Sequence, residues 1–296
     1  MEKFAIFTDS AGDIEKDLRE KYDIDYCSMN VSWDGQEHLA SLDWDQGFTP
    51  HEFYDLMRRG TRIFTTQVPA TEFDKKFRQH LDNGEDICYI SCSNALSGSI
   101  NTARNVAAKL ALLYPQRKIL CIDTLISGFA QGAMAIKASE MRKDGKTIDE
   151  VEQCVESIKL KYNQFGTTED LSFLKRAGRV SASSAFFGNL FAVKPIVISD
   201  AKGHNYAYKK VKGRRASLIE IAQSSVEASE NPQDQIIWIS HADDLESAEF
   251  VKQEILKRAR YKDVHIGFVG PIIGASTGPG TVIVYCFGKE VTIAGE

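Results

Sequence analysis

One cluster of hydroxyl-bearing residues directly follows an apolar run of the sequence. After residues 87–90 the chain carries Ser91, Ser93, Asn94, Ser97 and Ser99. If a helix begins there, its free N–H groups attract an anion, and the hydroxyl groups can add hydrogen bonds. A single serine at such a place is more often a helix cap. Four hydroxyl groups and an amide exceed what one cap requires, so the cluster indicates an anion-binding site.

Two other segments offer the same chemistry. One is the Thr65-Thr66 pair, and the other is the glycine-rich tail of residues 270–280, which contains Ser276 and Thr277. Hydroxyl and backbone N–H groups can hold a carboxylate without a cationic side chain, because their hydrogen bonds offset its desolvation. The alternative for Thr66 is that it is present only because threonine favours β-strands. For the tail, the alternative is a simple loop before the strand at residues 281–287.

An acyl ligand would also need an apolar slot. Residues 172–191 are rich in large apolar side chains, namely Phe173, Phe186, Phe187, Leu190 and Phe191. Ordinary core packing is the alternative for each of them. At about 0.8 kcal/mol per buried methylene, a long acyl chain would gain on the order of 10 kcal/mol. A gain of that size would suffice for tight binding of a lipid without catalysis.

Signatures of catalysis are weak in this sequence. No Gly-x-Ser-x-Gly motif occurs, and His241 is the one histidine placed at a strand end like a catalytic base. Gly145-Lys146-Thr147 resembles part of a phosphate loop, but Glu140 stands where that motif needs glycine. We therefore expect a binding protein and not an enzyme.

Composition and charge argue against several other functional classes. The six cysteines form no Cys-x-x-Cys pair and the six histidines are scattered, so no metal site is predicted. The net charge is -5 and the basic stretches at 176–179 and 209–215 are short, which argues against nucleic-acid binding. A strand at residues 4–7 leaves no room for a signal peptide, and no apolar run is long enough to span a bilayer. We expect a soluble, cytoplasmic chain with no stable membrane insertion.

The first half of the chain alternates strands with helices. Strands are predicted at residues 4–7, 24–31, 87–90 and 118–122, and helices at 13–21, 50–59, 99–113, 128–141 and 148–161. Three of the strands end in Asp or Ser clusters and lead into helices, which is typical of a parallel, helix-covered sheet. Asp9 and Ser10, at the end of the first strand, belong either to a turn with a helix cap or to a ligand cleft.

The pattern changes at residues 162–168, where we place a domain boundary. Beyond a short helix at 171–177 and a helical stretch ending at 192, a hairpin is predicted at 196–199 and 206–211. Helices at 216–228 and 243–260 and strands at 235–240, 265–269 and 281–287 follow. The fold class is therefore α/β with two domains, residues 1–161 with a mainly parallel sheet and residues 162–296 with a mixed sheet.

Six segments in order match a known family. They are Thr8-Asp9-Ser10-Ala11-Gly12-Asp13, Thr65-Thr66-Gln67, Ser93-Asn94-Ala95-Leu96-Ser97-Gly98, Asp123-Thr124 with Ser127-Gly128, residues 174–181, and residues 270–274 with 278–280. The sequence resembles the DegV family of bacterial fatty-acid-binding proteins. The resemblance implies a fatty acid bound between two α/β domains, with the tail in the second domain and no cofactor.

The resemblance also implies a set of contacts. A threonine of the Thr65-Thr66 pair and Ser93 match family positions that hydrogen-bond the carboxylate. Together with the hydroxyl clusters described above, the predicted head-group residues are Thr65, Thr66, Ser93, Asn94, Ser97, Gly98, Ser276 and Thr277. The resemblance implies a separate ATP-dependent fatty acid kinase as partner, with Arg179 and Lys212 handling the partner or the phosphate. Ser276 stands where the family usually has histidine, and Lys212 where it often has arginine. These departures favour the alternative, a lipid carrier or sensor that is not coupled to a kinase.

Overall fold

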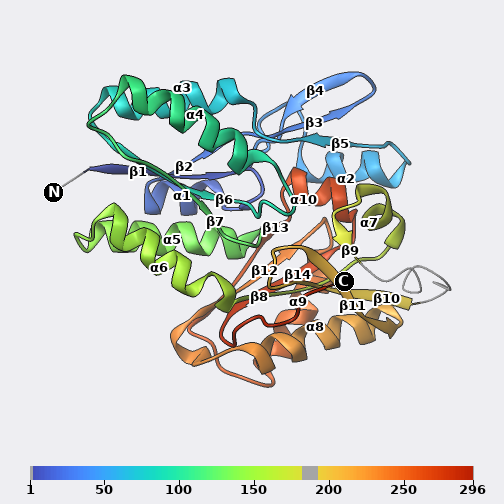
Figure 1. Cartoon of the computed structure of the whole chain (residues 1–296). Coiled ribbons are helices and arrows are strands. Elements are labelled where there is room, and N and C mark those ends of the chain that lie inside the picture. Colours follow the sequence, from blue (N-terminus) through green and yellow to red (C-terminus); the bar gives the residue numbers. More distant parts are fainter. Residues whose placement is uncertain (1–2, 182–192, 296) are drawn as a thin grey trace.

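The computed structural model describes residues 3–181 and 193–295 of the chain (Figure 1). The first half builds sheet A, a four-stranded parallel sheet in the order β2-β1-β6-β7. Its strands are β1 (Phe4–Asp9), β2 (Ile24–Cys27), β6 (Asp86–Ser91) and β7 (Ile119–Asp123). β1, β6 and β7 are parallel neighbours, so their carboxyl ends lie at one edge, as the sequence predicts.

Helices cover both faces of sheet A. They are α1 (Lys16–Tyr22), α3 (Ala70–Asp82), α4 (Ser99–Leu113), α5 (Phe129–Lys143) and α6 (Ile148–Ile158), whereas α2 (Pro50–Arg58) packs against the helix at Pro271–Thr277. The predicted bounds of α4 are confirmed. The prediction for α1 is wrong at its start, because Asp13 has a φ of 50° in the left-handed region and the helix begins three residues later.

The single strand predicted at residues 24–31 is two strands in different sheets. β2 ends at Cys27, and β3 (Asn30–Trp33) joins β4 (Gln36–Leu39) and β5 (Phe64–Thr66) in the antiparallel sheet B. Met29 lies between them, where its N–H donates to Ser10 Oγ at 3.0 Å and its carbonyl accepts from Ala40 N at 2.8 Å. These two bonds satisfy the backbone outside any ladder and explain the break.

The second half builds sheet C, with seven strands in the order β13-β12-β14-β8-β10-β11-β9. They are β8 (Tyr162–Thr167), β9 (Val180–Ser181), β10 (Val193–Ser199), β11 (Asn205–Lys212), β12 (Ile236–His241), β13 (Asp263–Phe268) and β14 (Val282–Phe287). Both parallel and antiparallel pairs occur, so the predicted hairpin and mixed sheet are confirmed. The 3₁₀ turns Lys159–Lys161 and Pro232–Asp234 flank it, and α8 (Arg214–Ala228) and α9 (Leu245–Leu256) cover its outer face.

Helix α5 lies between sheets A and C (Figure 1). It contacts β1 and β6 on one side and β12 and β14 on the other, and ten of its residues are buried. Trp238 and Tyr285 from sheet C therefore share one hydrophobic core with the first half of the chain. Since both sides of the helix are covered, it has no wide polar face.

The glycine-rich tail contains a helix that the sequence prediction missed. Pro271 opens α10 (Pro271–Thr277), and Gly278 ends it in the left-handed region. Proline at the first helical position and glycine after the last are ordinary start and stop signals. Their close spacing in a glycine-rich stretch predicted a loop instead. α10 packs against α2 and the short α7 (Leu171–Ala177) (Figure 1).

Candidate functional site

A cavity of about 180 Å³ lies where the carboxyl edge of sheet A meets β5, α4 and α10. Six of the residues predicted to bind a carboxylate line it, namely Thr65, Thr66, Ser97, Gly98, Ser276 and Thr277. They come from three segments far apart in the sequence. Apolar side chains form much of the remaining wall: Met29, Leu96, Leu174, Val180, Ile272 and Ile273. The cavity thus combines hydroxyl groups with an apolar surface.

Strand β5 is held against the start of α4. Gln67 donates from Nε2 to Thr102 Oγ1 at 2.7 Å, and Val68 N–H donates to Ser99 Oγ at 3.1 Å. Gly98 leaves room for this contact, since a Cβ atom there would collide with Gln67 Oε1. The Thr65-Thr66 pair is therefore fixed next to the amino end of a 15-residue helix.

No serine occupies the cap position of α4. Gly98 is the N-cap, and its first turn receives no side-chain cap. Ser97 Oγ instead accepts from Ser99 N at 3.3 Å and lies 2.9 Å from Ser99 Oγ. The positive end of the helix dipole thus faces the cavity wall at Ser97 and Gly98, where it favours a negative group.

Ser93 and Asn94 lie outside the set that lines the cavity. Ser93 is buried, and its Oγ donates to the carbonyl of Gly203 at 2.8 Å. Asn94 is exposed, where its N–H faces the Asp123 carboxylate and its Oδ1 accepts from Asn101 Nδ2. Both side chains already have partners in this arrangement.

A smaller cavity of about 30 Å³ continues from the first toward sheet C. The two share Ser127, Leu174, Val180, Asn205, Ile273 and Thr277. Its inner wall includes Val197 and Ile283. Phe173, predicted for the apolar slot, lines a different space, and Phe186, Phe187, Leu190 and Phe191 lie outside the described residues. The apolar wall that the structure describes therefore comes mostly from residues that the sequence prediction did not select.

A third cavity, of about 130 Å³ and rich in arginine, adjoins the 180 Å³ cavity at its mouth. Thr65, Arg179 and Ser276 line both spaces, and Arg62 and Arg176 are added in the second. The Arg176 guanidinium lies 4.5 Å from the centre of the Phe173 ring, a cation–π contact. Lys212 is exposed at the end of β11 and lines neither cavity.

Asp9 supports the wall from behind. Its buried carboxylate accepts from Ala11 N, Cys92 N and Tyr89 Oη at 2.6–3.0 Å, while burial raises its pKa. These bonds hold Ala11 and Cys92 at the cavity wall. The segment forms a turn in which the carbonyl of Asp9 accepts from Gly12 N at 2.9 Å, and Asp9 caps no helix. Burial also raises the pKa of Cys92 well above its ordinary value, so its thiol is a poor nucleophile.

The structure does not bring a histidine to these hydroxyl groups. Among the described residues that line the cavity there is none, and His241 lines a separate depression with Glu15 and Asp243. His241 Nδ1 accepts from Asp244 N at 3.2 Å, and burial lowers its pKa. A serine–histidine pair is therefore absent from the described part of the cavity.

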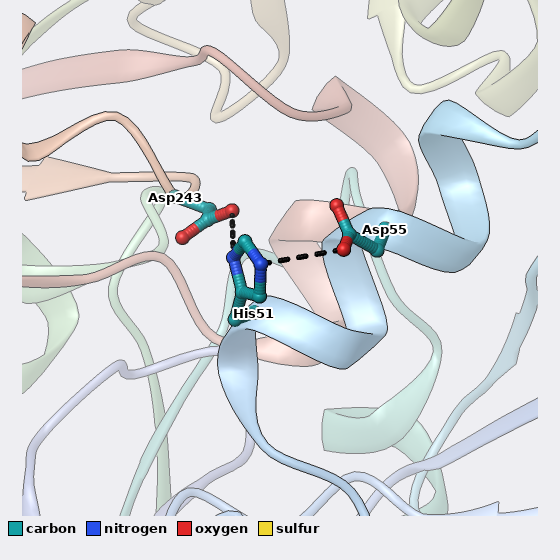
Figure 2. A group of neighbouring side chains, drawn as sticks. All are labelled: His51, Asp55 and Asp243. Carbon is teal, nitrogen blue, oxygen red and sulfur yellow. Dashed lines mark hydrogen bonds and ion pairs between the residues drawn. The ribbon is translucent and has the colours of Figure 1, made fainter.

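One group of described side chains has the spacing of metal ligands, namely His51, Asp55 and Asp243. Figure 2 shows His51 between the two carboxylates, with His51 and Asp55 on α2. Arg58 Nη1 donates to both carboxylates, at 2.8 and 2.6 Å. The Arg58 guanidinium already occupies both carboxylates, and its bonds to Asp243 join α2 to the loop before α9, so a structural role for the cluster is sufficient.

Within the described residues, no helix combines the length and apolar character needed to cross a membrane.

Three polar residues at the cavity were not among the predicted head-group residues, namely Gln67, Ser127 and Asn205. Gln67 and Ser127 belong to segments that match the family, and Gln67 directly follows the Thr65-Thr66 pair, so both could have been selected. Asn205 lies at the start of a hairpin strand, where no local pattern marks it as a wall residue. Only the packing of α5 against sheet C brings it to the cavity.

The chain is similar to known proteins over nearly its whole length. The model of the family described as "Uncharacterised protein, DegV family" matches residues 3–288. A DegV domain-containing protein of Clostridium perfringens is 35% identical over 288 residues, covering 97% of this chain and 98% of that one. A DegV family protein from Thermus thermophilus, described by its fatty acid binding, has a TM-score of 0.87 at 24% identity, covering 97% and 100% of the two chains. DegV from Bacillus subtilis, described as a fatty acid binding protein, has a TM-score of 0.83 at 25% identity, also covering 97% and 100%.

Proposed function

The chain belongs to the DegV family, and from this premise we propose that it binds a long-chain fatty acid. The carboxylate lies in the cavity between β5, α4 and α10. The tail follows the apolar wall toward sheet C. The similarity to proteins described as fatty acid binding supports the class of ligand.

One observation carries the proposal. Six predicted head-group residues meet at one cavity, and an apolar wall leads from it to a second, inner space. Hydroxyl groups and the amino end of α4 suit a carboxylate, because hydrogen bonds to its oxygens and the positive end of the helix dipole both stabilise its ionised form. Leu174, Val180 and Ile273 line both spaces and suit methylene groups. A ligand with one anionic end and an apolar body matches both parts.

Arg179 adds a positive charge beside the predicted head-group residues. It is exposed at the mouth and lines both the main cavity and the arginine-rich cavity. A cation there strengthens attraction of a carboxylate and offers a place for a phosphoryl group transferred to it. We therefore propose that the protein presents the carboxylate to a separate, ATP-dependent fatty acid kinase in the cytoplasm, and is itself not an enzyme.

A lipid carrier or sensor without a kinase is the second proposal. Ser276 at the cavity wall and Lys212 away from it are the observations that favour it. Serine does not titrate near neutral pH, and lysine lacks the bidentate fork of arginine. Phosphorylation of the bound acid by a partner kinase and ATP would exclude this alternative.

Native mass spectrometry of the purified protein, followed by organic extraction, tests the binding proposal. A stoichiometric fatty acid supports it and gives the chain length. A protein that is empty and also binds no added fatty acid contradicts it.

A further inference from the structure

Two amide side chains form part of the wall of the inner cavity, where an acyl tail would be expected to meet only apolar groups. Gln164 on β8 and Asn205 on β11 both line it. Gln164 is 6% exposed, and its Nε2 donates to Asn205 Oδ1 at 2.9 Å. Since β10 lies between β8 and β11, this bond spans one strand of sheet C.

The amide pair is only partly satisfied by the protein. Each amide has a donor and an acceptor group, and the bond between them uses one group of each side chain. The other two, Gln164 Oε1 and Asn205 Nδ2, bond to no other residue that the structure describes. Whichever way the amides are turned, one carbonyl oxygen and one whole NH2 group are left over, together with the second N–H of the donating amide.

The orientation of Gln164 follows from the strand register. Gln164 pairs with Tyr285 and Gly166 pairs with Ile283, so Gln164 shares the face of sheet C that carries Ile283. Ile283 lines the inner cavity and belongs to the core shared with α5. The Gln164 side chain is thus on the face toward the cavity and not toward α8.

An unsubstituted hydrocarbon tail in this space would leave both amide groups without partners. A buried polar group without a hydrogen bond loses free energy relative to water. An in-chain hydroxyl group both donates and accepts, and it therefore matches the acceptor and the donor of the pair. The hydroxyl of Ser127, on the wall of both cavities, adds polar character to the same path.

We propose that the preferred ligand is a fatty acid with a hydroxyl group along its chain, which inserts at the Gln164–Asn205 pair. This inference rests on the proposed fatty acid function and specifies its substrate class. An ordered water is the other occupant that fits, since about 30 Å³ is room for a water molecule.

Calorimetric titration of the delipidated protein distinguishes a hydroxy fatty acid from a bound water as the partner of the amide pair. The probes are octadecanoic acid and its mono-hydroxy derivatives with the hydroxyl at successive positions. We expect one derivative to bind about tenfold more tightly than octadecanoic acid, as one additional buried hydrogen bond allows. Gln164→Met has a similar shape without the amide and is expected to lose this preference. Gln223→Met, at an exposed position on α8, is the matched control and is expected to retain it.

Asn205→Leu is the second variant, to be measured if Gln164→Met does not fold. It too is expected to lose the preference for the hydroxy derivative over octadecanoic acid. Wild-type protein that binds octadecanoic acid as tightly as every hydroxy derivative overturns the inference and leaves fatty acid binding intact. Binding of none of the acids overturns the proposed function, and this inference with it.

Discussion

The hydroxyl of Ser93 donates a 2.8 Å hydrogen bond to the carbonyl of Gly203. Ser93 follows sheet A, while Gly203 lies in the turn between β10 and β11 of sheet C. Gly203 has a φ of 82°, and a Cβ atom there would collide with Ser93 Oγ. This bond therefore joins the loop behind the cavity to the second sheet, at a point where only glycine fits.

Ser93→Ala is expected to lower the free energy of unfolding by about 1 to 3 kcal/mol, because the carbonyl of Gly203 loses its buried donor. The affinity for a fatty acid is expected to change less than about twofold, since Ser93 does not line the cavity. Urea unfolding and ligand titration measure the two effects. Unchanged stability with a large loss of affinity would return Ser93 to the carboxylate site.

Gly98→Ala is expected to weaken fatty acid binding about tenfold while the protein stays folded. The added methyl group collides with Gln67 Oε1 and pushes that side chain, which also lines the cavity, away from Thr102. Gln67→Ala removes the same Thr102 hydrogen bond without a collision, so it is expected to weaken binding to a similar extent, and adding Gly98→Ala to it is expected to cost little more. If Gly98→Ala alone binds as tightly as wild type, the close contact does not shape the site.

Much of the fold could be predicted because its signals are local. Residues 99–113 have helical spacing of apolar side chains, and their bounds agree with α4. The break at Met29 could not be predicted, because it depends on Ser10 and Ala40, which are distant in the sequence. α10 was missed because its seven residues lie in a glycine-rich stretch and its stability comes from packing on α2 and α7.

The site could be predicted only in part, for a related reason. Hydroxyl groups at Thr65, Ser97 and Ser276 stand out in the sequence and meet at the cavity. The apolar wall did not stand out, since Ile273 and Val180 look like ordinary core residues. Which apolar residues face a cavity depends on how α5 and sheet C pack, and no local pattern records that.

Asp13→Asn is expected to reduce the pH dependence of stability. Burial raises the pKa of Asp13 well above its ordinary value of 3.8, so the folded state binds more protons than the unfolded state above that pH. Stability from this group is thus complete below about pH 4 and is lost as the pH rises toward the folded-state pKa. Asparagine tolerates the left-handed backbone at this position, and its Oδ1 can still accept from Gly270 N.

Urea unfolding between about pH 4 and pH 8 measures this effect. The Asp13→Asn variant is expected to lose less stability across the range than wild type, with Asp9, whose pKa is also raised, supplying the remaining slope. Asp144→Asn, which changes an exposed carboxyl group, is the control. Parallel curves for Asp13→Asn and wild type would exclude Asp13 as the source.

Ser276→His is expected to fold normally, because position 276 is half-buried on α10 at the cavity wall. A protonated imidazole would attract the carboxylate, so fatty acid affinity is expected to rise as the pH falls below about 6.5. Wild type is expected to show no such increase. Titrations at several pH values decide this, and a pH-independent variant would place Ser276 away from the head group.

The most direct test of the account is the position of the ligand itself. A crystal structure of the delipidated protein, reloaded with a fatty acid brominated at its terminal carbon, locates the tail by anomalous scattering. We expect the carboxylate beside Thr65, Thr66 and Ser97, and the bromine displaced toward Ile283 and sheet C. A carboxylate elsewhere, or bromine at the mouth beside Arg179, would contradict the proposed orientation.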